Sequence, residues 1–342
     1  MTTLERPARP SLLARLIGLT LGLGAFLVVT MALAANIGAQ PIPLSVIFES
    51  ARGGAESRLA DIFWHLRLPR VALGAVVGMA LTVAGGSLQG LLMNPLADPY
   101  LVGVSAGAAF GASIAMLLHL GGVLGGAGKC LIAFASGAVT MLVVLWLARE
   151  RRGMQRDAFI LAGVVVGSFM WALVTLVMTL AGRDLQEIVF WLMGNLNGQI
   201  DWAVIAVVAV LVVIGCVALY SYARDLNLLA LGEEQAKQLG VETERLKTNV
   251  ILFSALVTAA AVSVSGVIGF VGLVIPHMAR KLVGPDHRIL LPAAGLLGAA
   301  FLVWADTVAR LIAEIFPVGV LTSLLGAPFF FYLLKRRPAG AA

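Results

Sequence analysis

Long apolar runs separated by short polar stretches set the organisation of this chain. Nine runs are visible, at 16–35, 71–92, 100–120, 130–148, 158–181, 202–222, 250–276, 289–313 and 318–334. Most contain about the twenty residues that a helix needs to cross a bilayer. The pattern predicts an all-α polytopic membrane protein, with residues 1–342 forming one transmembrane domain.

Positive charge predicts which side of the membrane each polar stretch occupies. Basic clusters fall at 6–15, 149–156, 224–247, 280–288 and 335–337, and such clusters stay in the cytoplasm. Two of them flank run 250–276, so that run must return to its starting side. Ser263, Ser265, Gly266 and Gly269 lie in its middle and predict a tight hairpin of two shorter helices. The count becomes ten transmembrane helices, with both termini cytoplasmic.

The longest polar stretch is Ala223–Thr248, which carries nine charged residues. Each charge would cost several kcal/mol in hydrocarbon, so the segment must protrude. Gly232 and Gly240 predict two short helices and a turn. A small apolar face is expected from Leu231, Ala236, Leu239 and Val241. The mixed charge favours a protein partner over anionic lipid, and a solvated connector is the alternative.

A second polar feature is the turn Asn94-Pro-Leu-Ala-Asp-Pro99 between the second and third runs. Two prolines four positions apart, Pro95 and Pro99, forbid a continuous helix. The turn is either a plain connection or the inner mouth of a pathway, because irregular backbone at membrane depth lines an aqueous path or is buried in protein.

Charged residues on the predicted outer side form two groups. Arg67-Leu-Pro-Arg70 precedes the second run, where the arginines are either snorkelling anchors or receivers of a partner's carboxylates. Asp306, Arg310 and Glu314 are spaced i, i+4, i+8 and share one helical face. They form either a self-paired ladder or a rim that faces a partner.

Composition supports the membrane interpretation. The chain is 60% hydrophobic and 12% charged, about half the charge of a soluble domain. The net charge of +6 arises from cations between apolar runs and does not indicate nucleic acid. Neither the two cysteines nor the four histidines have the spacing of a metal site. We therefore predict no catalytic residues and no metal site.

Several stretches together resemble one family, the FecCD-type permeases of ABC importers for ferric siderophores, haem and cobalamin. They are RLPR at 67–70, QGLLMNPLADPYLVGVSAGAA at 89–109, FWLMG at 190–194, LGEEQAKQLGV at 231–241, 266–280 and PVGVLTSLLGAPFFFYLL at 317–334. They follow the family's order along nearly the whole chain. One departure is Met93, where many members carry arginine before Asn-Pro-Leu-Ala.

The resemblance implies an assembly in a bacterial inner membrane. It implies a homodimer with the pathway on its two-fold axis, two cytoplasmic ATPases that bind ATP and magnesium, and a periplasmic substrate-binding protein. No cofactor is expected in this chain. The implied sites are a cytoplasmic gate (Asn94, Leu96, Gln155, Arg156, Asp157), an ATPase-docking segment (Leu231, Gly232, Glu233, Glu234, Ala236, Leu239, Gly240, Val241) and binding-protein contacts (Arg67, Arg70, Arg310).

Function is predicted as ATP-driven import of an iron complex, a ferric siderophore or haem, by a subunit that is not itself an enzyme. Cobalamin is the alternative cargo. An ion-coupled secondary transporter is a second alternative, which usually needs buried ionisable residues at mid-membrane; Asp306 is the one candidate. An intramembrane enzyme would need a convergent nucleophile and base or a metal set, and the sequence offers none.

Overall fold

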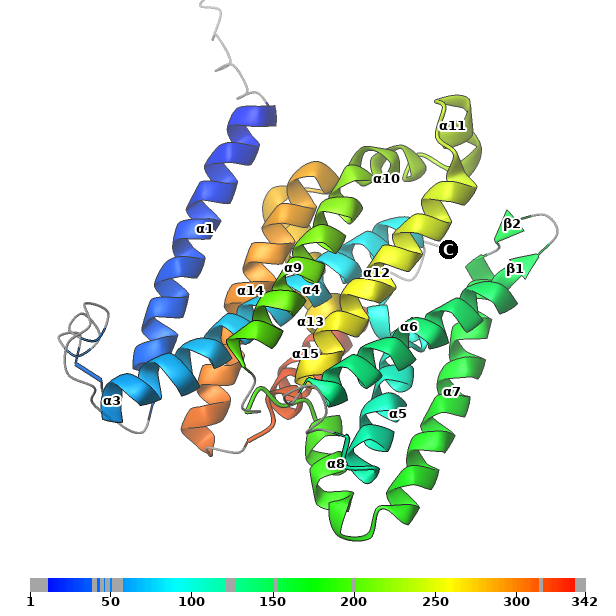
Figure 1. Ribbon diagram of the computed structural model, residues 1–342. Coiled ribbons are helices and arrows are strands. Elements are labelled where there is room, and N and C mark those ends of the chain that lie inside the picture. The colour runs from blue at the N-terminus through cyan, green and yellow to red at the C-terminus, as the bar shows by residue number, and fades with distance from the viewer. Residues whose placement is uncertain are drawn as a thin grey trace, which may run out of the picture.

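A computed structural model describes residues 12–38, 42–43, 46, 50, 58–120, 127–150, 153–154, 156–197, 201–313 and 316–335. This part of the chain is a helical bundle with one two-residue hairpin, β1 (Arg149–Glu150) and β2 (Gly153–Met154) (Figure 1). The all-α prediction is confirmed.

The helices follow in chain order. They are α1 (Leu12–Asn36), α3 (Arg58–Asp61), the π-helix η1 (Ile62–Arg67), α4 (Leu68–Leu91), the 3-10 helix η2 (Pro99–Val102), α5 (Val104–Leu117), α6 (Gly128–Ala148), α7 (Arg156–Leu180), η4 (Gly182–Asp184), α8 (Leu185–Leu192), α9 (Trp202–Ser221), α10 (Ala223–Leu229), α11 (Glu233–Gln238), α12 (Thr243–Ser265), α13 (Val271–Val283), α14 (His287–Ile312) and α15 (Val318–Lys335). Seven of the described helices are long and apolar enough to cross a membrane, and α5 and Val318–Tyr332 are shorter apolar helices.

The apolar run 250–276 is broken at 266–270, where the sequence predicts a break. Gly266 and Phe270 have positive φ angles of 67° and 68°, and such angles interrupt a helix. The prediction of two shorter helices is wrong for the first of them. Helix α12 has 23 residues, because it begins at Thr243, inside the polar segment, rather than at the start of the apolar run.

Helix α4 lies at the centre of the fold and packs against α9, α12, α13 and α14 (Figure 1). Glycines let these helices approach at backbone distance. A Cβ placed on Gly78 would collide with the carbonyl of Gly298, and one on Gly85 with the carbonyl of Gly272. Gly78 and Gly85 therefore belong to a surface of α4 that packs against the neighbouring helices.

Replacing Gly85 with alanine is expected to destabilise the bundle by about 1–3 kcal/mol or more, the usual cost of overpacking. The added Cβ would lie 2.9 Å from the Cα of Gly272, and backbone cannot rotate away. Gly22→Ala in α1 is the matched control, since no atom lies within 4 Å of the added Cβ there. Thermal unfolding in detergent measures both variants, and equal midpoints would contradict the packing role.

The polar elements divide between two ends of the molecule. The start of α1, the β1–β2 hairpin and the α10–α11 segment lie at one end, and α3 and α8 lie at the other (Figure 1). The first end carries Arg149 and the charged residues of 223–248. We call it the basic end.

Candidate functional site

Two short helices form half of the polar segment at the basic end, as the sequence predicts. Helices α10 and α11 are separated by a bend in which Gly232 has φ 121°, and Gly240 after α11 has φ 87°. Both angles are strained for a residue with a side chain. The rest of the segment, from Thr243, is the first turns of α12.

The apolar residues of this segment do not share one face, which corrects the prediction. Ala236 and Val241 are buried, at 0% and 8% exposure, whereas Leu231 and Leu239 are 63% and 57% exposed. The first pair anchors α11 against its neighbours. The second pair leaves two large apolar side chains in water, and such exposed side chains are what a protein partner covers.

Most of the charged residues in this segment pair with one another. The pairs are Lys237 with Glu233 and Glu234, Lys247 with Glu233 and Glu244, and Arg245 with Glu242. The Nζ atom of Lys247 lies 2.7 Å from Oε1 of Glu233, and this hydrogen bond lowers the pKa of Glu233 below its ordinary value, against the opposing effect of burial. The bridge ties α11 to the first turns of α12.

The Asn94–Pro99 turn satisfies its own backbone. The Asn94 Oδ1 atom accepts from the amide of Leu96 at 2.9 Å, and Asp98 Oδ1 accepts from the amide of Tyr100 at 2.8 Å, which caps η2. Asn94 is exposed and Leu96 is half-buried. The Tyr100 hydroxyl donates to the carbonyl of Ile268 at 2.9 Å, so the turn is tied to the break between α12 and α13.

The second predicted gate loop leads into α7, and α7 contacts η2, which follows the Asn94–Pro99 turn. Gln155 and the side chain of Arg156 fall outside the described residues, and Asp157 is exposed in the first turn of α7. Gly103, which ends η2 with φ 77°, packs on the backbone of Gly163 and Gly167 in α7. This contact joins η2 to α7, at positions beyond the predicted gate residues of each.

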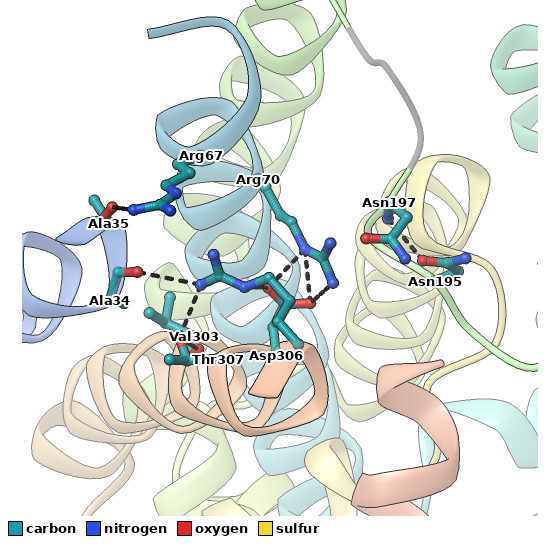
Figure 2. Close-up of polar contacts among 10 residues, drawn as sticks. Ala34, Ala35, Arg67, Arg70, Asn195, Asn197, Val303, Asp306 and Thr307 are labelled. Atoms are coloured by element: carbon teal, nitrogen blue, oxygen red, sulfur yellow. Dashed lines mark hydrogen bonds and ion pairs between the residues drawn. The ribbon is translucent and has the colours of Figure 1, made fainter. Parts of the chain in front are cut away.

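At the opposite end, the carboxylate of Asp306 holds two arginines (Figure 2). Arg70 Nη2 lies 2.7 Å from Oδ1 and Arg70 Nε lies 2.8 Å from Oδ2, a bidentate pair between α4 and α14. Arg310 Nε lies 3.2 Å from Oδ2, within ion-pair distance, although without hydrogen-bond geometry. Asp306 is 2% exposed, and the two arginine side chains are 12% and 11% exposed.

The same arginine group closes the end of α1. The last carbonyls of a helix lack partners within the helix, and cations are favourable there. Arg67 Nη1 donates to the carbonyl of Asn36 at 3.2 Å and to that of Ala35 at 3.5 Å, the second of which Figure 2 shows. Arg310 Nη2 donates to the carbonyl of Ala34 at 3.2 Å. We call Arg67, Arg70, Asp306 and Arg310 the arginine cluster.

The arginine cluster shows what these arginines contact within the chain. The sequence predicts anchors, a self-paired ladder or contacts to a partner for Arg67, Arg70 and Arg310, and Asp306 and the end of α1 engage them within the chain. The ladder of Asp306 and Arg310 is present, and Glu314 lies outside the described residues. Sequence reasoning missed the Arg70–Asp306 pair, whose members are 236 positions apart. A docking role for these arginines stays a prediction.

Comparison with known proteins places the chain in a family. Residues 26–336 match the FecCD transport family, and the chain belongs to it. This match runs from within α1 to the end of the described residues.

Individual relatives align over most of their length. The chain is 41% identical over 306 residues to the cobalamin import system permease protein BtuC of Halobacterium salinarum, which covers 89% of this chain and 82% of that one. It is 40% identical over 329 residues to the hemin transport system permease protein HmuU of Yersinia pestis, with 93% and 96% covered. A solved structure of the metal-chelate type of ABC transporter, in an inward-facing conformation, superposes with a TM-score of 0.77 at 33% identity and covers 94% of this chain and 99% of that one.

The chain is therefore a multi-pass membrane protein and the permease of an ABC importer. Permeases of this family are transport components and not enzymes, and the family works with an ATPase and a binding protein. The relatives carry names for cobalamin, hemin and iron(3+)-hydroxamate, so the family alone leaves the cargo open.

Proposed function

We propose that this chain moves an iron complex, a ferric siderophore or haem, across a bacterial inner membrane as one half of a homodimer driven by two cytoplasmic ATPases. The similarity to permeases named for hemin and iron(3+)-hydroxamate, and to the metal-chelate transporter structure, supports the cargo class. Cobalamin is the alternative, supported by the relative that is 41% identical.

The orientation proposed is ten spans with both termini in the cytoplasm. The helices counted are α1, α4, α5, α6, α7, α9, α12, α13, α14 and α15. The basic end then faces the cytoplasm, in agreement with the retention of Lys and Arg on that side. The arginine cluster faces the periplasm, where the binding protein approaches.

The observation that carries ATP coupling is the exposure of Leu231 and Leu239 on a polar segment at the basic end. An ion-coupled carrier is disfavoured by the same structure. Its one candidate for a buried ion-coupling residue, Asp306, is already neutralised by Arg70 and Arg310.

Uptake into proteoliposomes tests the cargo and the energy source together. We expect permease, ATPase and binding protein, reconstituted together, to take up a ferric siderophore or haem when ATP is supplied and ion gradients are dissipated. A cobalamin competitor should not reduce that uptake. Uptake of cobalamin alone would select the alternative cargo, and uptake that needs an ion gradient but no ATP would refute the proposal.

Replacing Leu239 with glutamate is expected to release the ATPase from the purified complex and abolish uptake. A charge in a buried interface centre is unfavourable, and truncating such hot spots often costs 2 kcal/mol or more. Leu118→Glu is the matched control, since Leu118 is 58% exposed and also follows the end of a helix, in its case α5. Co-purification at the wild-type ratio in the Leu239 variant would contradict docking at this segment.

A further inference from the structure

Asn227, in the middle of α10, fastens the proposed docking segment to the start of α14. Its Nδ2 donates to Oδ1 of Asp286 at 2.7 Å, and its Oδ1 accepts from the backbone amide of His287 at 2.9 Å. The same Oδ1 lies 2.8 Å from Nδ1 of His287. Because an amide oxygen only accepts, Nδ1 carries the proton and donates. One side chain thus makes three polar contacts across 59–60 positions of sequence.

These contacts also cap a long helix. Asp286 is the N-cap of α14 and accepts from the amide of Arg288 at 3.0 Å. Helix α14 runs from this end to the arginine cluster, so α10 is fixed to a helix that spans the bundle. Burial raises the pKa of Asp286, but hydrogen bonds from the side chain and amide of Arg288 and from Asn227 outweigh it and hold that pKa below its ordinary value, which keeps Asp286 an acceptor.

The imidazole of His287 continues the connection to α4. His287 is 6% exposed, and its ring occupies a notch over Gly90, where an added Cβ would collide with Nε2. The carbonyls of Gln89 and Gly90 accept the amides of Asn94 and Met93, at 3.1 and 3.3 Å. The ring therefore packs on the last turn of α4. The carbonyls of that turn hold the start of the Asn94–Pro99 turn by hydrogen bonds.

A second side chain joins α13 to the same point. Gln89 Nε2 donates to the carbonyl of Leu273 at 3.1 Å, and both terminal nitrogens of Arg280 lie 3.3 Å from its Oε1. A cavity of about 630 Å³ lies between these groups and is lined by Gln89, Asn227, Arg280 and His287 among others. Ala223, Leu226 and Leu229 bury one face of α10 in the core, whereas on the side of the cavity Asn227 holds α10 through directional polar contacts.

We propose that Asn227 is the positioning residue that transmits movement of the docking segment to the inner turn, through Asp286 and His287 to Gly90 and on to Asn94. The inference rests on the proposed ATPase docking at 231–241. Rigid elements joined by directional contacts move as one unit, whereas without Asn227 only the apolar packing of Leu226 and Leu229 would couple α10 to its neighbours.

The test measures coupling rather than activity alone. In the reconstituted complex, Asn227→Ala is expected to keep ATPase co-purification and ATP hydrolysis but to lower transport per ATP hydrolysed by at least about fivefold, the usual lower range for a coupling effect. With Leu96→Cys in the same chain, cross-linking between the two copies should no longer depend on nucleotide.

Two further variants distinguish a loss of coupling from a folding defect. Gly90→Ala attacks the same connection from the α4 side by displacing the His287 ring, and should give the same loss of transport per ATP. Asn249→Ala is the control, because Asn249 Nδ2 donates to the Tyr222 hydroxyl at 2.8 Å within the same region without contacting α14 or α4 through that bond. It should leave the ratio unchanged.

The outcomes separate the two proposals. If Leu239→Glu leaves the ATPase bound, the docking proposal fails whatever Asn227 does. If docking holds and both Asn227→Ala and Gly90→Ala keep the wild-type ratio and nucleotide-dependent cross-linking, the role of Asn227 is refuted. An equal loss in Asn249→Ala would also refute it, because the effect would then be general to the segment.

Discussion

Asp306→Ala is expected to lower the free energy of unfolding by about 3–5 kcal/mol, the usual cost of removing one partner of a buried ion pair. The variant leaves the guanidinium groups of Arg70 and Arg310, which are 12% and 11% exposed, without their anion. They cannot move into water without separating α4, α14 and the end of α1. Thermal or denaturant unfolding in detergent measures the loss.

An exposed ion pair of similar length is the control for this experiment. Arg245 and Glu242 lie 2.8 Å apart, but their side chains are 79% and 66% exposed. Glu242→Ala should therefore cost only about 0–1 kcal/mol. Converting both arginines to methionine in the Asp306→Ala background should recover part of the loss. If the Asp306 variant were no less stable than the Glu242 variant, the arginine cluster would have no structural role.

This result bears on the predicted docking of a binding protein. Because the same arginines hold the ends of three helices, exchanging them for glutamate would destabilise the permease and weaken any partner's binding at once. Docking is better tested by changing acidic residues on the partner. The arginines then stay in place, and loss of affinity reports only on the interface.

Leu96→Cys is expected to form a disulfide with its symmetry mate in one nucleotide state, and to block transport until it is reduced. Two Asn94–Pro99 turns facing each other across the axis of the proposed homodimer would bring these side chains together. A disulfide requires Cα atoms within about 7 Å. Its formation therefore shows that the two copies of residue 96 lie close together in that nucleotide state. Cys130 and Cys216 are free and should first be replaced by alanine.

Leu282→Cys provides the control for random collision. Leu282 is 70% exposed near the inner end of α13 and should not cross-link in a nucleotide-dependent way. The gate prediction would be wrong if the cysteine at 96 fails to cross-link under every nucleotide condition and Leu96→Gly neither leaks nor loses transport. The turn would then be only a connection between α4 and η2.

Local sequence patterns were enough to locate most of the membrane-spanning helices. Apolar length predicts most of the spans, and the polar segment 223–248 and the interruption at 263–269 follow from residues that cannot continue a helix in lipid. The family resemblance was also carried by local motifs, and the family match at 26–336 confirms it. These features depend on residues close together in the chain, so they need no tertiary information.

Only the tertiary structure decided which faces are buried. Runs of similar hydropathy ended in opposite surroundings: 83% of the apolar window in Arg58–Leu91 is buried, against 6% in Leu12–Asn36. In lipid an exposed helix face is as apolar as a buried one, so the hydropathy pattern does not indicate whether a face contacts lipid or another helix. For the same reason the sequence did not show that Leu239 is exposed and Ala236 buried, or that Arg70 meets Asp306 and Asn227 meets His287. Those contacts arise from the packing of helices that are distant in the chain.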